Sequence, residues 1–107
     1  MSSKRQVYLF TYGTLQDIEV QQATFNRILK GHKDQLNGYI LAKHKIYGQY
    51  PVIKASSSPA DSVTGTAYEI DITDLDAADA YETEVYKRIE VILASNRTAW
   101  VYIENKE

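Results

Sequence analysis

The run VYLFTY (residues 7–12), near the start of the chain, consists of apolar, aromatic and β-branched residues and is followed by Gly13 and Thr14. Such a run predicts a buried strand, and the Gly-Thr pair predicts its end. This run constrains the fold more than any other feature, because the rest of the chain must enclose it. Residues 1–6 are polar and lead directly into it, so we expect no signal peptide.

Short helix-like and strand-like segments follow. A helix is expected over residues 18–30, with Asp17 as its N-cap and Gly31 as the residue after its C-terminus, and another over residues 74–83, after Thr73. Strands are expected at residues 36–42, 50–53, 65–72, 86–93 and 98–103, and a Ser-rich surface loop at residues 55–64. This order predicts an α+β fold with a curled or closed sheet around one small core.

Composition excludes several classes of function. We expect the 107 residues to form a single domain, residues 1–107. The net charge of −2 and the scattered basic residues argue against binding to nucleic acid. No apolar run approaches the roughly 18 residues of a membrane span, so we expect no membrane partner. The absence of cysteine excludes disulfides and thiolate chemistry and fits a cytoplasmic protein.

The sequence contains no recognisable metal or cofactor motif. His32 and His44 lack the spacing of metal ligands, and the scattered aspartates lack the spacing of a calcium loop. No Gly-rich phosphate loop and no Ser/His/Asp set is apparent. We therefore expect neither a metal nor a cofactor.

Glu82 is the first candidate for chemistry. A helix advances about 100° per residue, so Glu82 shares a face with the apolar residues Leu75 and Ala78. Burial there would raise the pKa of its carboxyl, and Asp79 one turn earlier would act in the same direction. A carboxyl with a raised pKa suits general acid–base catalysis. The alternative is that Glu82 pairs with Arg88 or Lys87, or lies in water at a frayed helix end.

The turn after the first strand is the second candidate. Tyr12, Gly13, Thr14 and Leu15 stand where a strand ends and a helix soon begins. Backbone N–H groups at such a turn can hold a carboxylate or a developing oxyanion, and glycine permits close approach. An ordinary connection between strand and helix is the alternative.

These segments resemble the γ-glutamylcyclotransferase-like family, and in particular its AIG2-like branch. The resemblance is carried, in the family's order, by LFTYGTL (9–15), QDIEVQQATFNRI (16–28), YPVI (50–53), VTGTAYEI (63–70) and DAYETEVYKRIEV (79–91). It implies a small mixed β-barrel with flanking helices and a pocket at one end. It further implies that Tyr12, Gly13, Thr14 and Leu15 bind the glutamyl group, that Glu82 is the acid/base and that Tyr86 is a pocket wall.

The reaction that the resemblance implies is cyclisation of a γ-glutamyl amine or peptide to 5-oxoproline with release of the amine. A non-catalytic module that binds an amino-acid-like ligand, and an interaction domain with a pocket blocked by Tyr50 or Tyr86, are the competing interpretations. We expect residues 50–53 and the Ser-rich loop to cover the pocket. The identity of the amine and the existence of a homodimer are left open by the sequence.

Overall fold

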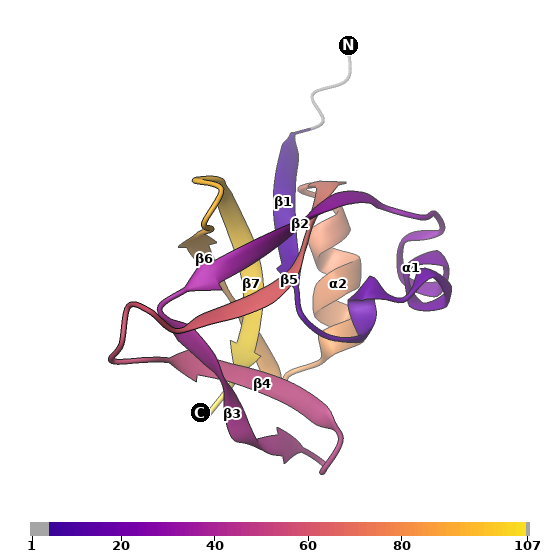
Figure 1. The fold of residues 1–107 in the computed structure, drawn as a ribbon. Helices are drawn as coiled ribbons and strands as arrows, with labels where there is room; N and C mark the ends of the chain where they lie inside the picture. The colour runs from indigo at the N-terminus through magenta and orange to yellow at the C-terminus, as the bar shows by residue number, and fades with distance from the viewer. Residues whose placement is uncertain (1–4, 107) are drawn as a thin grey trace.

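The computed structural model describes residues 5–106 (Figure 1). In chain order its elements are β1 (Gln6–Thr11), the short 3-10 turn η1 (Thr14–Gln16), α1 (Ile18–Phe25), β2 (Lys30–Asn37), β3 (Tyr39–Ile46), β4 (Tyr50–Ala55), β5 (Ser62–Asp71), α2 (Asp74–Glu82), β6 (Tyr86–Ile92) and β7 (Thr98–Glu104). The expected α+β class is confirmed. Neither helix in this part of the chain is long and apolar enough to cross a membrane.

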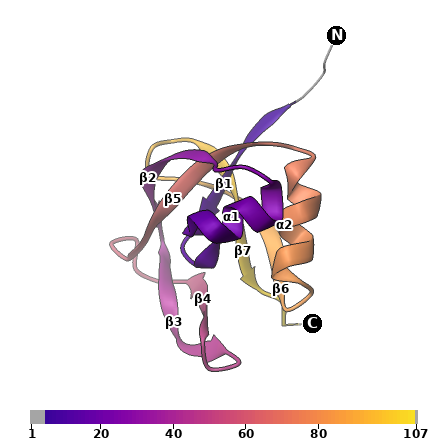
Figure 2. The same cartoon turned by 90° about the vertical axis from the view of Figure 1, so that its right-hand side faces the viewer.

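The strands form two sheets. The larger has the order β2-β5-β1-β7-β6, with β1 and β7 parallel and the other neighbours antiparallel, and β3 pairs with β4 in a separate hairpin (Figures 1 and 2). The closed barrel implied by the resemblance is not confirmed. The larger sheet curls until its two edges meet at one corner, where the Ala94 N–H donates to the Gln35 carbonyl at 2.8 Å. Close by, the Ser95 hydroxyl donates to the Asp34 carboxylate at 2.5 Å.

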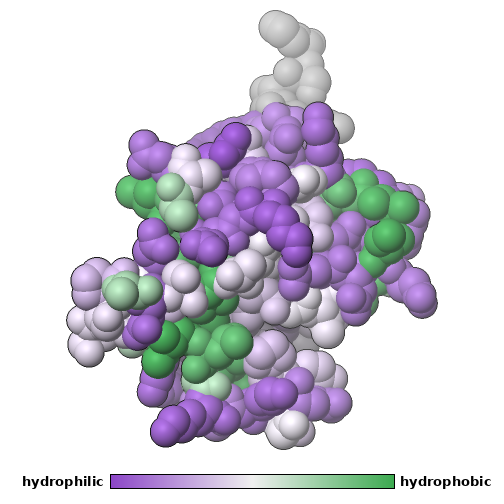
Figure 3. Space-filling view, viewed as in Figure 1, coloured by the Kyte–Doolittle hydropathy of each residue, from purple (hydrophilic) through white to green (hydrophobic). Residues whose placement is uncertain are grey.

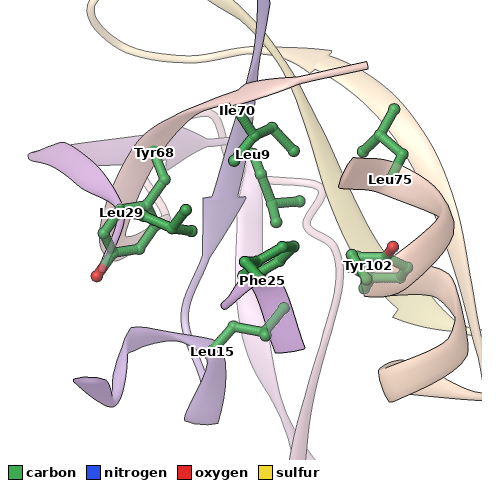
Figure 4. Close-up of a cluster of buried hydrophobic side chains, with 9 residues drawn as sticks. Leu9, Leu15, Phe25, Leu29, Tyr68, Ile70, Leu75 and Tyr102 are labelled. Atoms are coloured by element: carbon green, nitrogen blue, oxygen red, sulfur yellow. The ribbon is translucent and has the colours of Figure 1, made fainter. Parts of the chain in front are cut away.

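β1 is buried on both faces. Leu9, 0% exposed, packs with Phe25 and Leu75 on the side of the two helices (Figure 4). Phe10, 1% exposed, points to the other side, where it packs with Val101 inside the curl of the sheet. Successive side chains of a strand point to opposite faces, so a strand between two cores has no solvent-facing positions to keep polar. This explains the continuous apolar run.

The first helix is shorter than predicted. It ends at Phe25, and Asn26 follows in the left-handed conformation, with φ 61°. Asparagine tolerates this conformation, so it takes the place expected of Gly31. Gly31 lies instead in β2, where a Cβ would stand 2.5 Å from Cδ1 of Tyr68. The glycine is thus required by a close approach and not by a helix end.

The predicted strand at residues 36–42 is in fact the junction of two strands. Gly38, with φ 83°, separates the end of β2 from the start of β3, and the two strands belong to different sheets. The first of them, KGHKDQLN, is largely polar and turns only Asp34 and Leu36 fully inward. Its pairing with β5 positions it, which no hydrophobic pattern could indicate. By contrast, α2 and the strands β4 to β7 lie close to their predicted positions.

A buried glutamine joins the helix α1 to the loop that follows β1. Gln21 is 2% exposed; its Nε2 donates to the Leu15 carbonyl at 2.9 Å, and its Oε1 accepts from the Leu29 N–H at 3.0 Å. One amide therefore satisfies two backbone groups from opposite ends of the helix. Both Leu15 and Leu29 belong to the core beneath the helices (Figure 4).

Replacing Gln21 by leucine should lower the free energy of unfolding by about 3 kcal/mol, because a buried carbonyl and a buried N–H would lose their partners. Urea denaturation measures the change. The neighbouring and exposed Gln22 provides the control: Gln22→Leu should alter stability by less than about 0.5 kcal/mol. Equal effects of the two substitutions would show that the buried amide is not a structural link.

Candidate active site

A small cavity lies where β1, η1, α2 and β4 meet. Figure 1 shows the positions of β1, α2 and β4. Its volume is ≈ 30 Å³, and we call it the inner cavity. It is lined by Phe10, Thr11, Tyr12, Gly13, Thr14, Leu15, Tyr50, Pro51, Glu82, Tyr86 and Tyr102. The cavity thus brings together all the residues that the sequence nominated: the turn after β1, Glu82 and Tyr86.

The turn offers backbone donors. Its internal hydrogen bonds use the N–H groups of Gln16 and Asp17, which donate to the carbonyls of Gly13 and Thr14 at 3.1 and 2.9 Å. None of them uses the N–H groups of Gly13, Thr14 or Leu15. A Cβ at Gly13 would meet only Cγ of Pro51, at 3.7 Å, an ordinary van der Waals distance. No neighbouring atom therefore excludes a Cβ there, and the space beside it is open to a ligand.

Glu82 is the last residue of α2 and extends the face that buries Leu75 and Ala78. Burial raises the pKa of its carboxyl from 4.5 to about 7. Within residues 5–106, no group donates a hydrogen bond to this carboxylate or pairs with it. At neutral pH it can therefore either accept or release a proton, as an acid/base must.

Asp79 does not raise the pKa of Glu82, contrary to the prediction. Arg88 forms a two-fold hydrogen-bonded ion pair with Asp79, at 2.9 Å for each bond, and the Tyr102 hydroxyl donates to the same carboxylate at 2.6 Å. These bonds hold the pKa of Asp79 below its usual range. Arg88, one of the partners considered for Glu82, is thereby occupied. The raised pKa of Glu82 comes from burial and not from a neighbouring like charge.

Tyrosine hydroxyls fix the walls of the inner cavity. The Tyr12 hydroxyl donates to the Tyr102 carbonyl at 2.7 Å, and the Tyr86 hydroxyl donates to the Pro51 carbonyl at 2.8 Å. Burial raises the pKa of Tyr12, and raises that of Tyr86 to about 12. Both side chains are therefore neutral at physiological pH. The bond from Tyr86 also ties the β3–β4 hairpin to β6, so this wall is positioned by two elements far apart in sequence.

A second and larger cavity adjoins the first and shares four of its lining residues. Its volume is ≈ 250 Å³, and we call it the outer cavity. It is lined by Thr14, Tyr47, Tyr50, Tyr81, Glu82, Thr83, Val85 and Tyr86. Tyr47 and Tyr81 were not among the predicted site residues. The signal for Tyr81 was its position directly before Glu82, whereas the packing of the hairpin that carries Tyr47 could not be predicted from the sequence.

Thr11 was also missed. Its side chain is 6% exposed, and its hydroxyl is the one buried side-chain polar atom in the described residues without a hydrogen-bond partner. Thr11 follows Leu9 by two positions in β1, so it points to the face of the sheet that α2 covers. It also lines the inner cavity. A buried hydroxyl without a partner destabilises the protein. The Thr11 hydroxyl is therefore available to bond with a ligand or a water molecule.

Other expected contributors lie elsewhere. Of the segments expected to cover the pocket, Tyr50 and Pro51 line it, but the Ser-rich loop contributes no residue to either cavity. Gln16 supports the turn from outside, because its Oε1 accepts from the Thr66 hydroxyl at 2.9 Å and its Nε2 donates to the Gly13 carbonyl at 3.2 Å. Across residues 5–106, no three His, Asp or Glu side chains are placed to share a metal ion.

Solved structures share this fold. The solution structure of At3g28950.1 from Arabidopsis thaliana matches with a TM-score of 0.81 at 22% identity, over 97% of this chain and 66% of that chain. A structure described as gamma-glutamyl cyclotransferase matches with a TM-score of 0.74 at 18% identity, over 94% and 68% of the two chains. The protein PH0828 from Pyrococcus horikoshii matches with a TM-score of 0.69 at 18% identity, over 94% and 80%.

This chain thus spans slightly less than two thirds of the Arabidopsis protein, at 66% of its length. Among curated proteins, none matches the sequence significantly. The family model described as "Gamma-glutamyl cyclotransferase, AIG2-like" matches residues 9–107, which is nearly the whole sequence and includes every residue of both cavities. On this match, the chain belongs to the AIG2-like gamma-glutamyl cyclotransferase family.

Proposed function

We propose that this protein is a γ-glutamylcyclotransferase, which converts the γ-glutamyl group of a γ-glutamyl amine or peptide to 5-oxoproline and releases the amine. The observation that carries the proposal is the position of Glu82. Its half-buried carboxyl has a pKa of about 7 and lines the same cavity as the turn after β1. In that turn, the N–H groups of Gly13, Thr14 and Leu15 take no part in the internal hydrogen bonds. This is the combination of a proton acceptor and oxyanion donors that lactam formation requires.

The first step is proton transfer. The α-amine of a γ-glutamyl group is protonated in neutral water and cannot attack. Glu82 takes one proton from it, and the nitrogen lone pair then attacks the γ-carbonyl carbon to form the new C–N bond of the five-membered ring. The oxygen becomes an oxyanion, for which the N–H groups of Gly13, Thr14 and Leu15 are the candidate donors.

The second step is release. As the carbonyl re-forms, the bond between the γ-carbon and the substituted nitrogen breaks. Glu82 returns its proton to that nitrogen and then accepts the second hydrogen of the cationic ring nitrogen, which leaves the neutral lactam N–H. The amine departs, and Glu82 passes this last proton to it, so that it leaves as its ammonium form. Binding in a folded conformation favours the reaction because the two ends of the glutamyl chain are already close. No cofactor takes part in either step.

The competing interpretation is a binding module on the same fold. A binder has no need of a titrating carboxyl, and a glutamine at position 82 would serve it equally well. The burial that raises the pKa of Glu82 favours the enzyme. Tyr50 and Tyr86 line both cavities, and beside them the outer cavity keeps ≈ 250 Å³ of space, which a site blocked by these rings would not have.

Replacing Glu82 by glutamine should lower kcat by about 10²- to 10⁴-fold, because the amide cannot carry the proton. Release of 5-oxoproline from a panel of γ-glutamyl amines and dipeptides measures this. For the native protein, kcat/KM should rise with pH through about 7 as Glu82 ionises, and fall again when the substrate's own ammonium loses its proton. Glu84→Gln is the matched control, since Glu84 is exposed and lines neither cavity. Full activity of Glu82→Gln would refute the proposed role.

The same substitution should stabilise the protein, but only above acidic pH. Because the folded state holds the Glu82 proton more tightly than the unfolded chain does, folding is weakened as pH rises from 4.5 to about 7 and the weakening persists above that. At pH 8, Glu82→Gln should raise the free energy of unfolding by about 2 kcal/mol, less than the full shift gives because the carboxylate keeps contact with water. At pH 4 the two proteins should differ little. Urea denaturation at both pH values tests this, and a gain at pH 4 as large as that at pH 8 would contradict it.

The substitution Gly13→Ala should affect substrate binding without affecting the stability of the fold. The added methyl group would meet no protein atom closer than 3.7 Å, so the free energy of unfolding should change by less than about 0.5 kcal/mol. The methyl group would stand between a substrate and the backbone donors, so kcat/KM should fall roughly tenfold or more. Unaltered kinetics in the variant would show that the substrate does not approach this turn.

A further inference from the structure

The proposed reaction steps assign no role to the outer cavity. It shares Glu82, Thr14, Tyr50 and Tyr86 with the inner cavity, so the two spaces adjoin, with Glu82 in the lining of both. At ≈ 30 Å³ the inner cavity admits only the part of a glutamyl group that lies against the turn and Glu82, which returns the proton to the departing nitrogen. The substituent on that nitrogen must then extend into the outer cavity.

We propose that the outer cavity is the leaving-group site and that it selects neutral, apolar and preferably aromatic amines that carry no carboxylate. This inference rests on the proposed function, because it assigns the amine that the cyclotransferase releases. It follows from the surface, the charge and the size of the cavity.

The surface that the cavity presents consists mainly of tyrosine rings. The Tyr81 hydroxyl is hydrogen-bonded to the Thr14 hydroxyl at 2.6 Å, and the Tyr86 hydroxyl is bonded to the Pro51 carbonyl at 2.8 Å. Their polar ends are thus occupied by the protein, while their rings remain in the wall. Tyr47 and Tyr50 meet edge to face, with ring centroids 6.4 Å apart, and Val85 adds an aliphatic surface. Such walls favour flat apolar groups, which can stack on or abut the rings.

The charge of the lining excludes anions. No lysine, arginine or histidine is among the residues that line the outer cavity, and Glu82 is their only carboxylate. A carboxylate on the leaving group would lose water without gaining a cation and would also be repelled by Glu82. An ammonium group at the far end of the leaving group is also disfavoured. The only carboxylate in the lining is that of Glu82, which must exchange protons with the reacting nitrogens.

The size of the cavity restricts the leaving group further. Its volume of ≈ 250 Å³ is below the roughly 300–1,000 Å³ of pockets for drug-sized ligands. One ring on a short chain suits this space better than a dipeptide. Tyr47, at 76% exposed, forms the outer part of this wall near the turn of the β3–β4 hairpin.

Two matched substrate pairs test the selectivity. γ-Glutamyl-phenethylamine and γ-glutamyl-phenylalanine differ only in a carboxylate; γ-glutamyl-pentylamine and γ-glutamyl-1,4-diaminobutane differ only in a terminal methyl or ammonium group. We expect kcat/KM for 5-oxoproline release to be at least about tenfold higher for the neutral member of each pair. Equal or reversed rates in the first pair would overturn the inference while leaving the cyclotransferase activity established, and an advantage for the diamine would overturn its preference for neutral groups.

Binding to the Glu82→Gln variant provides a readout that does not require turnover. Calorimetry with the same four compounds should give the same ranking, and, because the charge of Glu82 is gone, any remaining preference belongs to the cavity walls. If no compound releases 5-oxoproline from the native protein, the proposed function fails. The selectivity of the site is then judged by these dissociation constants alone, and it is overturned if the four compounds bind equally.

Tyr47→Asn tests the wall directly. Tyr47 has φ 55°, a conformation in which asparagine is well tolerated, so the ring can be removed without straining the backbone. The preference for γ-glutamyl-phenethylamine over γ-glutamyl-ethylamine should fall about threefold or more in this variant. Ile28→Asn, at a residue 55% exposed and outside both cavities, should leave the preference unchanged. An undiminished preference in Tyr47→Asn would count against the aromatic wall.

Discussion

Burial of β1 on both of its faces is the constraint on which the rest of the structure depends. Leu9 requires the two helices to cover one side, and Phe10 requires the larger sheet to curl around the other. The strand must then end where the two cores meet the surface, and the turn at Gly13 and Thr14 forms there. The position of the cavity is therefore a consequence of packing: it occupies the end of the strand that neither core encloses. Elsewhere the surface in Figure 3 is largely hydrophilic, with apolar areas over α1 and the β3–β4 hairpin.

The sequence predicted those parts of the fold whose signals are local. The run of β1, the helix α2 and the placement of Glu82 on its apolar face could all be read from neighbouring residues. The end of α1 could not, because Asn26 stops the helix before its apolar pattern ends. Nor could β2, which is polar and is positioned by its partner β5. The family resemblance implied a closed barrel, but closure depends on how far the larger sheet curls. The backbone hydrogen bond from Ala94 to Gln35 joins the two edges of this sheet at one point and does not continue as strand pairing.

The candidate site shows the same division. The turn and Glu82 were predicted, and both line the inner cavity, but their chemical roles still rest on the proposed function. Tyr47 and Tyr81 depend on tertiary packing, the first on the hairpin and the second on its bond to Thr14. That the Thr11 hydroxyl lacks a hydrogen-bond partner can be recognised only from the three-dimensional structure. The cavity-lining residues that depend on tertiary packing are thus harder to foresee than Glu82, the proposed acid/base.

The ion pair between Arg88 and Asp79 lies outside the inner cavity, yet it bears on the acidity within it. With its charge matched by Arg88, Asp79 adds no repulsion to Glu82, one helical turn away. Without the arginine, an unmatched negative charge would remain there, and Glu82 would keep its proton to a higher pH. The pH range over which the Glu82 carboxyl titrates can therefore shift through a change at position 88, a residue that lines neither cavity. For the enzyme proposed here, substrate fit and working pH would thus depend on different residues.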